Sequence, residues 1–419
     1  MPFSKIGERL TARSGIEALM EDLGEALARS DTTIRMLGGG NPARIPAMEA
    51  VWRDRMEALL SDDAFGRMLG IYDPPQGNAR FCSAMAGYLR HKYGWEVGPE
   101  NIGITNGGQT AFFYLFNLLA GENSSGLHRK ILLPLMPEYI GYANQGLGPE
   151  FFTGVMAKIE RRDAHRFKYH LNFEQLQVDE TIAAICVSRP TNPSGNVLTD
   201  DEIVHLERLA RANDIPLIVD NAYGAPFPGI LFQPITPSWN EQIILTFSLS
   251  KLGLPGTRTG IVVARPEIIR AIAAMTAVTG LANGTIGQSL ITPLIESGEI
   301  DRLVQEIVQP FYRERSQKAQ AWIAEFLDND LNYAVHENEG ALFLWLWFPD
   351  LPIDAATLYQ RLKTRGVLVV PGNFFAYASP EAELHASRCI RLNFGLDDET
   401  VREGIRVLGE ELRLAVRRG

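Results

Sequence analysis

The chain of 419 residues has few cysteines and no long apolar run. Its three cysteines, Cys82, Cys186 and Cys389, are far apart and odd in number, and no CxxC pair occurs. This pattern argues against a disulfide scaffold and predicts reduced thiols in a cytoplasmic protein. The longest apolar stretch, residues 341–348, is far shorter than the roughly 20 residues of a membrane helix. The first residues mix charges without an apolar segment, so we expect neither a secretory leader nor a membrane partner.

Basic clusters and metal-binding patterns are also scarce. Forty Lys and Arg face fifty Asp and Glu, which gives a formal net charge of −10. No long basic run offsets this charge, so we expect no nucleic-acid partner. The seven histidines never approach HxxxH spacing, and no metal site is expected. What remains is an ordinary globular composition, 46% apolar and 21% charged, with length for two or three domains.

Helix-like patterns alternate with short apolar runs rich in β-branched residues from residue 53 onward. Several of the runs are almost uninterrupted, which is typical of strands buried on both faces. The helix expected at 200–213 begins with a capping-box pattern, Thr199-Asp-Asp-Glu. This alternation predicts an α/β fold with a mostly parallel sheet. The expected strands are 102–105, 131–134, 182–188, 217–220, 243–248 and 259–264.

The pattern changes near residue 300 and predicts a second unit. A long helix is expected at 300–327. Shorter elements follow at 341–348, 355–365, 367–370, 389–394 and from 398. We therefore expect a large domain at 46–299 and a smaller α+β domain at 300–419. Residues 1–45, a short helix and a Gly-rich loop, are too few for a domain of their own.

The string SLSKLGLPGTRTG at residues 248–260 carries the strongest chemical signal. A lysine becomes a nucleophile when its surroundings lower its pKa or hold it as a Schiff base. The serines and Arg258 offer hydroxyl donors and a forked cation, which suit a phosphate. Glycines let the backbone approach a ligand closely. A surface turn with a solvated Lys251 is the plainer interpretation, but it explains the whole string poorly.

Two further motifs end expected strands. In LIVDNAY, Asp220 closes a buried strand, where a carboxylate is costly without a partner and where α/β sheets bind ligands. It could hold a heterocyclic nitrogen protonated, and Tyr223 could reach the same ligand; a helix-capping Asp with a packed Tyr is the alternative. In SRPTNPSG, Asn192 could donate to a ligand oxygen from a loop that two prolines fix, although Asn-Pro is also common in plain turns.

Two motifs follow other expected strands. In TNGGQTA, a glycine turn at Gly108 and Gln109 opens a helix and presents free N–H groups to an anion. The pattern is neither GxGxxG nor a Walker loop, so it does not imply a nucleotide. In PEYIGY, Tyr139 could stack on a planar ring or simply pack in the core.

Together these motifs resemble the class I and II aminotransferases, enzymes of fold type I that use pyridoxal 5'-phosphate. The match covers essentially the whole chain, in order. It implies a large domain with a mostly parallel seven-stranded sheet flanked by helices, a smaller C-terminal domain, and a homodimer. It also implies that the N-terminal segment lines the active site and packs on the small domain.

The resemblance also implies residue roles. Lys251 would form the Schiff base with the cofactor, Asp220 would face the pyridine nitrogen, and Tyr139 would stack on the ring. Tyr223 and Asn192 would donate to its phenolic oxygen. Arg391 would bind the α-carboxylate of the substrate, and Gly40 would lie in a loop that lines the substrate. Tyr72 would reach the cofactor phosphate of the partner subunit. The cofactor phosphate of the same subunit would be bound by Gly108, Gln109, Ser248 and Arg258.

Longer strings narrow the resemblance. LGGGNPA, AFFYLFN, PEYIGY, PFPG and ALFLWLW are similar to the valine–pyruvate branch of the family. This implies transamination between an aliphatic amino acid and a 2-oxo acid, namely valine and pyruvate. Two alternatives stay open: a β-lyase, a decarboxylase or an aminotransferase for other substrates on the same fold, and a non-catalytic cofactor-binding regulator. The regulator normally carries a DNA-reading domain, for which residues 1–45 are too few.

Overall fold

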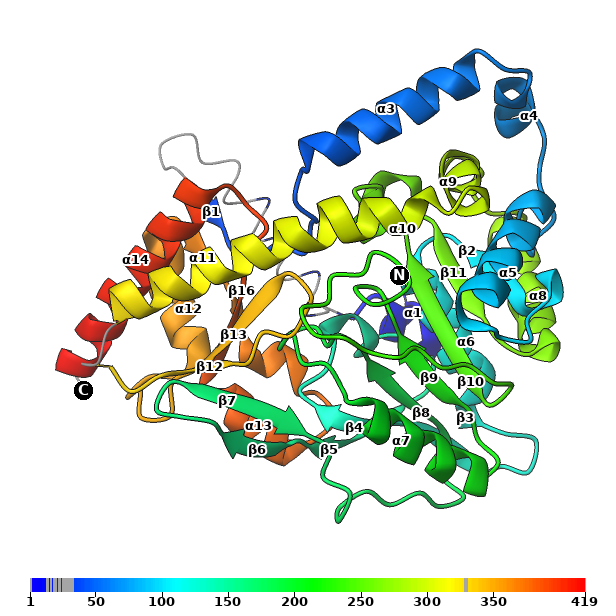
Figure 1. Ribbon diagram of the computed structural model, residues 1–419. Helices are drawn as coiled ribbons and strands as arrows, with labels where there is room; N and C mark the ends of the chain where they lie inside the picture. Colours follow the sequence, from blue (N-terminus) through cyan, green and yellow to red (C-terminus); the bar gives the residue numbers. More distant parts are fainter. Residues whose placement is uncertain are drawn as a thin grey trace.

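The computed structural model describes residues 2–12, 15, 17, 21, 24, 34–327 and 331–418. Parts of the Gly-rich N-terminal segment expected at residues 1–45 therefore lie outside the described residues. Two sheets dominate the molecule, and a long helix runs from one to the other (Figure 1). None of the helices in the described part of the chain is both long and apolar enough to cross a membrane.

The large sheet has the strand order β2-β11-β10-β9-β8-β4, and β4 also pairs with β3 and β5. Strands β10, β9, β8, β4 and β5 are parallel, whereas β11 is antiparallel to both of its neighbours. The sheet thus has eight strands rather than seven, because β3 and β5 add to the six strands expected from the sequence. The strands are β2 (Ile102–Thr105), β3 (Gly121–Glu122), β4 (His128–Met136), β5 (Phe152–Met156), β8 (Ile182–Ser188), β9 (Leu217–Asp220), β10 (Ile243–Ser248) and β11 (Gly260–Val263).

Burial explains why the apolar runs form this sheet. Every residue of β2, β8, β9, β10 and β11 is buried, so both faces are covered. The capping box at Thr199 is present, and its hydroxyl accepts from the amide of Glu202 at 3.1 Å. The helices of this half are α3 (Pro46–Leu60), α4 (Ala64–Gly70), α5 (Ala79–Tyr93), α6 (Gly108–Leu119), α7 (Asp200–Ala212), α8 (Pro266–Gly280) and α9 (Ile286–Glu296).

The second sheet has the order β15-β16-β13-β12-β7-β6. Its strands are β6 (Lys158–Arg161), β7 (Arg166–His170), β12 (Ala334–His336), β13 (Phe343–Trp347), β15 (Val370–Pro371) and β16 (Cys389–Asn393). Charged β6 and β7 escaped the sequence analysis. They pair with each other as a hairpin, and β7 joins the sheet through β12, which lies more than 160 residues further along the chain. Since this sheet draws strands from both proposed domains, the boundary at residue 299 stays a prediction.

Helices cover the second sheet and tie it to the first. The helix expected at 300–327 is α10 (Glu299–Leu303), the π-helical turn η5 (Val304–Val308) and α11 (Gln309–Leu327). α11 and α14 (Asp398–Arg418) pack together over the second sheet (Figure 1). The smaller elements are α12 (Ala355–Thr364), η6 (Gly372–Phe375), α13 (Pro380–Ala386) and the parallel pair of β1 (Arg35–Met36) with β14 (Val367–Leu368).

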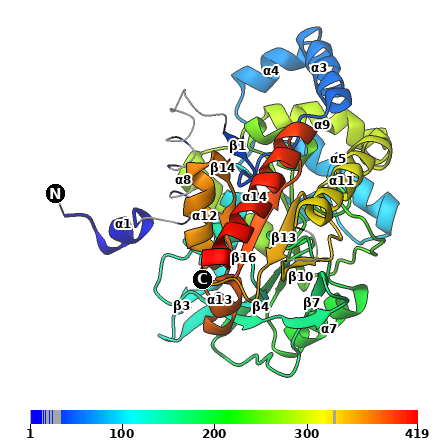
Figure 2. The same cartoon turned by 90° about the vertical axis from the view of Figure 1, so that its left-hand side faces the viewer.

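Two N-terminal elements extend away from the body. Helices α3 and α4 form an arm on one side, and α1 (Lys5–Leu10) projects on its own (Figures 1 and 2). The loop after α4 carries Ile71 and Tyr72 with exposed side chains. These apolar groups stand outside the core of this chain.

Candidate active site

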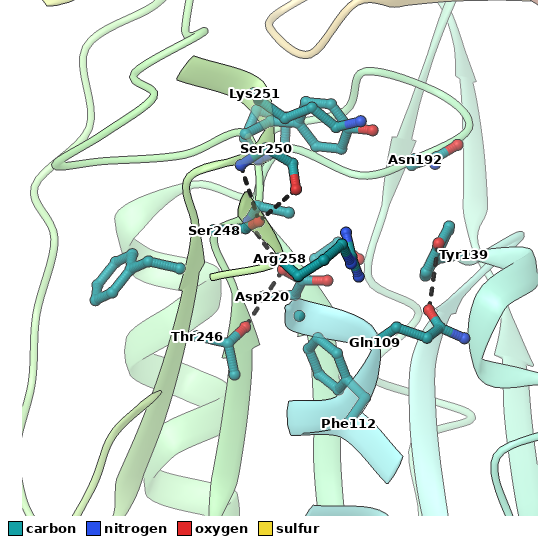
Figure 3. Close-up of a pocket in the computed structure, with 16 residues that line it drawn as sticks. Gln109, Phe112, Tyr139, Asn192, Asp220, Thr246, Ser248, Ser250, Lys251 and Arg258 are labelled. Carbon is teal, nitrogen blue, oxygen red and sulfur yellow. Dashed lines mark hydrogen bonds between the residues drawn. The ribbon is translucent and has the colours of Figure 1, made fainter. Parts of the chain in front are cut away.

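The carboxyl ends of the parallel strands meet at one edge of the large sheet, and a cavity of about 180 Å³ lies there (Figure 3). Ligands of open α/β sheets bind at this edge. The antiparallel β11 starts at the same edge, since Gly260 pairs with both Ser248 and Thr105. The lining residues are Gly108, Gln109, Phe112, Tyr139, Ser188, Pro190, Asn192, Asp220, Ala222, Tyr223, Thr246, Phe247, Ser248, Ser250, Lys251 and Arg258.

Asp220 ends β9 and is buried in the wall of this cavity. Its Oδ2 accepts from the Tyr142 hydroxyl at 2.6 Å, and its Oδ1 accepts from the Ala222 amide at 2.8 Å and from the Thr246 hydroxyl at 3.3 Å. Burial raises the pKa of Asp220, while these three hydrogen bonds and Lys251 act in the opposite direction. The donors thus fix the carboxylate in place and favour its charged form.

Lys251 lies in the short turn η3 (Ser250–Leu252) that follows β10. Its Nζ donates to the carbonyl oxygen of Gly40 at 2.5 Å and lies 5.4 Å from the ring centre of Tyr223. Burial lowers the pKa of Lys251 to about 8, and the charges of Arg391 and Arg258 add to this, whereas Asp220 opposes it. An amine with such a pKa is partly neutral near neutral pH and can act as a nucleophile or base.

One end of the cavity is equipped for an anion. The N-terminus of α6 begins there at Gly108, and Arg258 extends beside it. Gly107 has φ +90°, and a Cβ at this position would lie 2.3 Å from the Arg258 guanidinium, so only glycine fits. Ser250, the second serine of the string, receives a hydrogen bond from Ser248 at 3.0 Å between their hydroxyl oxygens. Helix N–H groups, two hydroxyls and an arginine are groups that could hold a phosphate.

Tyr139 lines the cavity just before the turn η2 (Ile140–Tyr142). Its hydroxyl points to Gln109 Oε1, 3.5 Å away (Figure 3). Its ring meets that of Tyr142 edge-on at 5.2 Å between centres. The side-chain nitrogen of Gln109 donates to the Gly141 carbonyl at 2.9 Å. Gln109 therefore stabilises the turn after Tyr139 and also lines the cavity.

A buried carboxylate, Glu138, stands behind this wall. It accepts hydrogen bonds from the Tyr139 amide at 2.7 Å and from the Ser188 hydroxyl and amide at 2.5 and 3.1 Å. Burial raises the pKa of Glu138 to about 8, and the charge of Asp220 adds to this, whereas the three hydrogen bonds lower it. Glu138 therefore joins the turn of Tyr139 to the end of β8.

Arg391 approaches from the second sheet and meets the loop of Asn192. Its Nη1 donates to Asn192 Oδ1 at 2.7 Å, and its Nη2 donates to the Gly38 carbonyl at 2.8 Å. The guanidinium lies 4.0 Å from the ring centre of Phe343 and 5.1 Å from that of Phe375. Its Nε is buried and has no hydrogen-bond partner among the residues that the structure describes. Burial lowers the pKa of Arg391 to about 10, so the group stays cationic near neutrality.

The structure brings together most of the residues expected from the sequence, with Tyr72 as the exception. Tyr223 lines the cavity, and its ring meets Phe343 edge-on. Gly40 and Arg391 lie next to the cavity, because they are hydrogen-bonded to its lining residues Lys251 and Asn192. Tyr72 is 79% exposed and does not line the cavity of its own chain.

The sequence analysis missed several supporting groups. Tyr142 and Thr246 donate to Asp220, Glu138 binds the end of the neighbouring strand β8, and Phe112 lines the cavity. Glu138 and Tyr142 both stood in the quoted string PEYIGY. Only the fold brings them to β8 and β9, which lie some 50 and 78 residues further along the chain.

Comparison with known proteins decides the family. The family model described as "Aminotransferase class I and II" matches residues 43–408. The chain belongs to the class I and II aminotransferases. Enzymes of this family depend on pyridoxal phosphate and act on amino acids and 2-oxo acids. The expected fold type I is thereby confirmed.

Several relatives are similar to this chain over nearly its whole length, in sequence or in structure. A valine–pyruvate aminotransferase of Escherichia coli K12 is 46% identical over 415 residues, 99% of each chain. The crystal structure of a valine-pyruvate aminotransferase from Salmonella typhimurium LT2 is 45% identical, with a TM-score of 0.89 over 97% of this chain and 100% of that one. A putative amino-acid aminotransferase from Psychrobacter arcticum 273-4 is 42% identical, with a TM-score of 0.96 over both whole chains.

Proposed function

We propose that this aminotransferase transfers the amino group of valine to pyruvate, which yields 2-oxoisovalerate and alanine. The observation that carries the proposal is the 46% identity to the valine–pyruvate aminotransferase of E. coli over 99% of both chains. The rings of Phe343 and Phe375, which lie against the Arg391 guanidinium, support it. Such surroundings suit a substrate with one carboxylate and an aliphatic side chain.

The residues of the cavity fit pyridoxal phosphate. Gly108, Gln109, Ser248, Ser250 and Arg258 would hold the phosphate, and Asp220 would face the ring nitrogen. Asp220 is buried and its three donors favour the carboxylate, which is the form needed to keep a ring nitrogen protonated. When bound, the cofactor supplies an electron sink for the electrons left at the Cα of the amino acid.

Two side chains and an aromatic ring would orient the cofactor ring. Tyr223 and Asn192 line the cavity and can each donate to a ring oxygen, and Tyr139 lies where it can stack. Asn192 keeps its amide nitrogen free for such a bond, because its Oδ1 already accepts from Arg391. Glu138 anchors Tyr139 and Ser188 at their backbone amides and thereby limits their movement.

Lys251 is the acid–base group. Its lowered pKa of about 8 leaves part of the amine neutral at physiological pH. The neutral Nζ accepts the proton from the Cα of the amino acid and can release it again within the same site.

Arg391 binds the α-carboxylate of the substrate. Its Nε lacks a partner within the described chain, and a carboxylate would satisfy this buried donor. Asn192 and the two rings hold the guanidinium plane in one orientation before any ligand arrives. No dedicated second cation is proposed for a distal carboxylate, so aspartate and glutamate should be poor donors.

We also propose a cytoplasmic homodimer in which Tyr72 reaches the phosphate of the partner subunit. The exposure of Tyr72 and of neighbouring Ile71 supports this, because both side chains leave the body of their own chain. The division into residues 1–45, 46–299 and 300–419 belongs to the same proposal.

An amino-donor panel with pyruvate tests the proposed reaction. Valine should give 2-oxoisovalerate and alanine in equal amounts, and alanine should donate to 2-oxoisovalerate in the reverse direction. Release of carbon dioxide or of a β-substituent in place of this balance would indicate a decarboxylase or lyase. A wild-type preference for glutamate of tenfold or more over valine and alanine would refute the substrate assignment and leave the family unchanged.

A further inference from the structure

The Gly-rich loop at residues 38–41 is held by side chains at every one of its carbonyl groups. Arg391 Nη2 donates to the Gly38 oxygen at 2.8 Å, and Lys251 Nζ donates to that of Gly40 at 2.5 Å. Asn393 Nδ2 donates to the oxygens of Gly39 and Asn41, at 2.8 and 3.2 Å. The loop therefore has three anchors, and all three are polar side chains at or beside the cavity.

Two of these anchors have other tasks. On the proposed function, which this inference rests on, Lys251 exchanges protons with the substrate and Arg391 binds its carboxylate. Lys251 and Arg391 therefore serve the ligand as well as the loop. Asn393 has no such task and makes its contacts entirely within the chain.

Asn393 is built to be a permanent anchor. Its side chain is 1% exposed, and its Oδ1 accepts from the Gly395 amide at 2.7 Å. The backbone amide of Asn393 donates to the Leu37 carbonyl at 2.7 Å. A buried side chain amide with all its polar atoms bonded in this way has one favoured position, because any other leaves a donor or acceptor unpaired.

The position of Asn393 on strand β16 links the loop to the carboxylate clamp. Arg391 and Asn393 are two residues apart on one strand, so their side chains lie on the same face of the sheet. The strand fixes the spacing between them. Gly40 meanwhile has open space where a Cβ would stand, next to the Lys251 amine. Through the Gly40 carbonyl and Lys251, the loop lies at the edge of the cavity.

We propose that Asn393 is a positioning residue that keeps the Gly38–Asn41 loop at a fixed distance from Arg391 and so sets the fit of a short aliphatic substrate. It touches neither substrate nor cofactor. Losing it should weaken substrate binding more than turnover, and should affect valine more than alanine, because the longer side chain depends more on the wall that the loop forms.

The experiment uses the holoenzyme with Asn393→Ala and Asn393→Asp. The aspartate keeps the acceptor for Gly395 and loses both donors to the loop. Asn101→Ala is the matched control, because Asn101 is also buried and bonds the Ala264 carbonyl and the Gly98 amide through its side chain, and it lies outside the cavity. Amide hydrogen exchange at residues 38–41, the steady-state constants for valine and alanine, and binding of 3-methylbutanoate are measured for each.

Both Asn393 variants should exchange the amides of residues 38–41 at least tenfold faster. The KM for valine and the dissociation constant of 3-methylbutanoate should rise about tenfold, with kcat changed less than threefold. The Asn101 variant should lose thermal stability without these changes. Unchanged exchange in the loop, or faster exchange with unchanged KM and analogue binding, would overturn the proposal. If neither variant folds while Asn101→Ala does, Asn393 is a core-stability residue and the proposal is wrong.

Failure of the proposed function gives a different result. A wild-type enzyme that does not use valine refutes the substrate assignment. Hydrogen exchange and the KM for whichever donor the wild type prefers would still decide the role of Asn393.

Discussion

The two walls of the active site are built in different ways. One wall consists of strand ends of the large sheet and carries Asp220, Ser188 and Ser248, each at the last position of a fully buried strand. The other wall combines β16 with the N-terminal loop, and Arg391 meets Gly38 across 353 residues of sequence. The strand-end wall follows from local patterns, whereas the second wall exists only when the two sheets have assembled.

This difference suggests that the two walls have different functions. The strand-end wall holds groups that need fixed geometry and a controlled charge. The second wall holds groups that recognise the substrate, and its loop is linked to the body by side-chain hydrogen bonds rather than by a sheet ladder. Substitutions in the strand-end wall should therefore alter the chemistry, and those in the second wall should alter substrate fit.

The largest effect is expected for Lys251→Ala, in the strand-end wall. Removing a positioned general acid–base group costs about 10²–10⁴-fold in kcat, and loss of the amine removes nucleophilic function as well. The exposed Lys158→Ala is the control. Steady-state kinetics with valine and pyruvate measure the loss of turnover. Borohydride reduction and peptide mapping of the wild type identify the lysine that carries the cofactor. Label on another lysine, or more than a tenth of wild-type turnover in Lys251→Ala, would contradict the assignment.

Arg391→Ala should cause the next largest loss, from the second wall. Losing one partner of a buried charge pair costs about 2–5 kcal/mol, which corresponds to a reduction in kcat/KM of roughly 30-fold to several thousandfold. Valine and alanine should suffer alike, because both carry an α-carboxylate. Arg365→Ala, which removes an arginine paired with Glu410 and Glu411 in the same half, should change stability only. A selective loss for one donor would mean that Arg391 recognises the side chain instead.

Tyr142→Phe should have a smaller effect, because it removes a hydrogen bond to Asp220 and keeps the packing of the ring. The ring remains held by Phe112 and Phe116, and only the bond to Asp220 Oδ2 is lost. A hydrogen bond to a charged group contributes about 1.5–3 kcal/mol, so the affinity for pyridoxal phosphate should fall by roughly 10- to 150-fold. Cofactor titration by absorbance measures this. Tyr114→Phe, which removes a buried tyrosine hydroxyl bonded to Thr279, is the control and should bind normally.

The smallest effects should appear in stability against pH, with opposite signs in the two halves. In the half with the second sheet, burial lowers the pKa of His336 in β12 to about 3 and that of His385 in α13 to about 4. The ordinary value is 6.5, so their contribution is present above pH 6.5 and is lost as the pH falls toward 4. His385 alone should account for about 2 kcal/mol between pH 7 and pH 5. Urea unfolding at the two pH values should show a smaller loss in His385→Gln.

Glu138 in the strand-end wall should respond in the other direction. Burial raises its pKa to about 8, so its contribution is present below its ordinary pKa of 4.5 and declines as the pH rises toward 8. Glu138→Gln should therefore flatten the alkaline side of the stability profile, measured by urea unfolding between pH 5 and pH 8.5. An unchanged slope there would show that the three hydrogen bonds keep Glu138 ionised throughout.

The sequence by itself determined the strand-end wall. Apolar runs long enough for buried strands, each followed by a polar residue and a glycine or proline, predict a parallel sheet with a site at its carboxyl edge. Lys251, Asp220, Asn192 and Arg258 were found in this way, because each lies within a few residues of the strand that positions it. The capping box at Thr199 is a local pattern of the same kind.

Only the tertiary structure decided which distant groups support these residues. The bonds of Tyr142 to Asp220, Glu138 to Ser188 and Asn393 to the N-terminal loop join segments 50 to 354 residues apart. The charged strands β6 and β7 became part of the second sheet for the same reason. They pair with each other locally, but β7 joins this sheet through β12, which the chain supplies much later, and neither periodicity nor local propensity encodes such a partner.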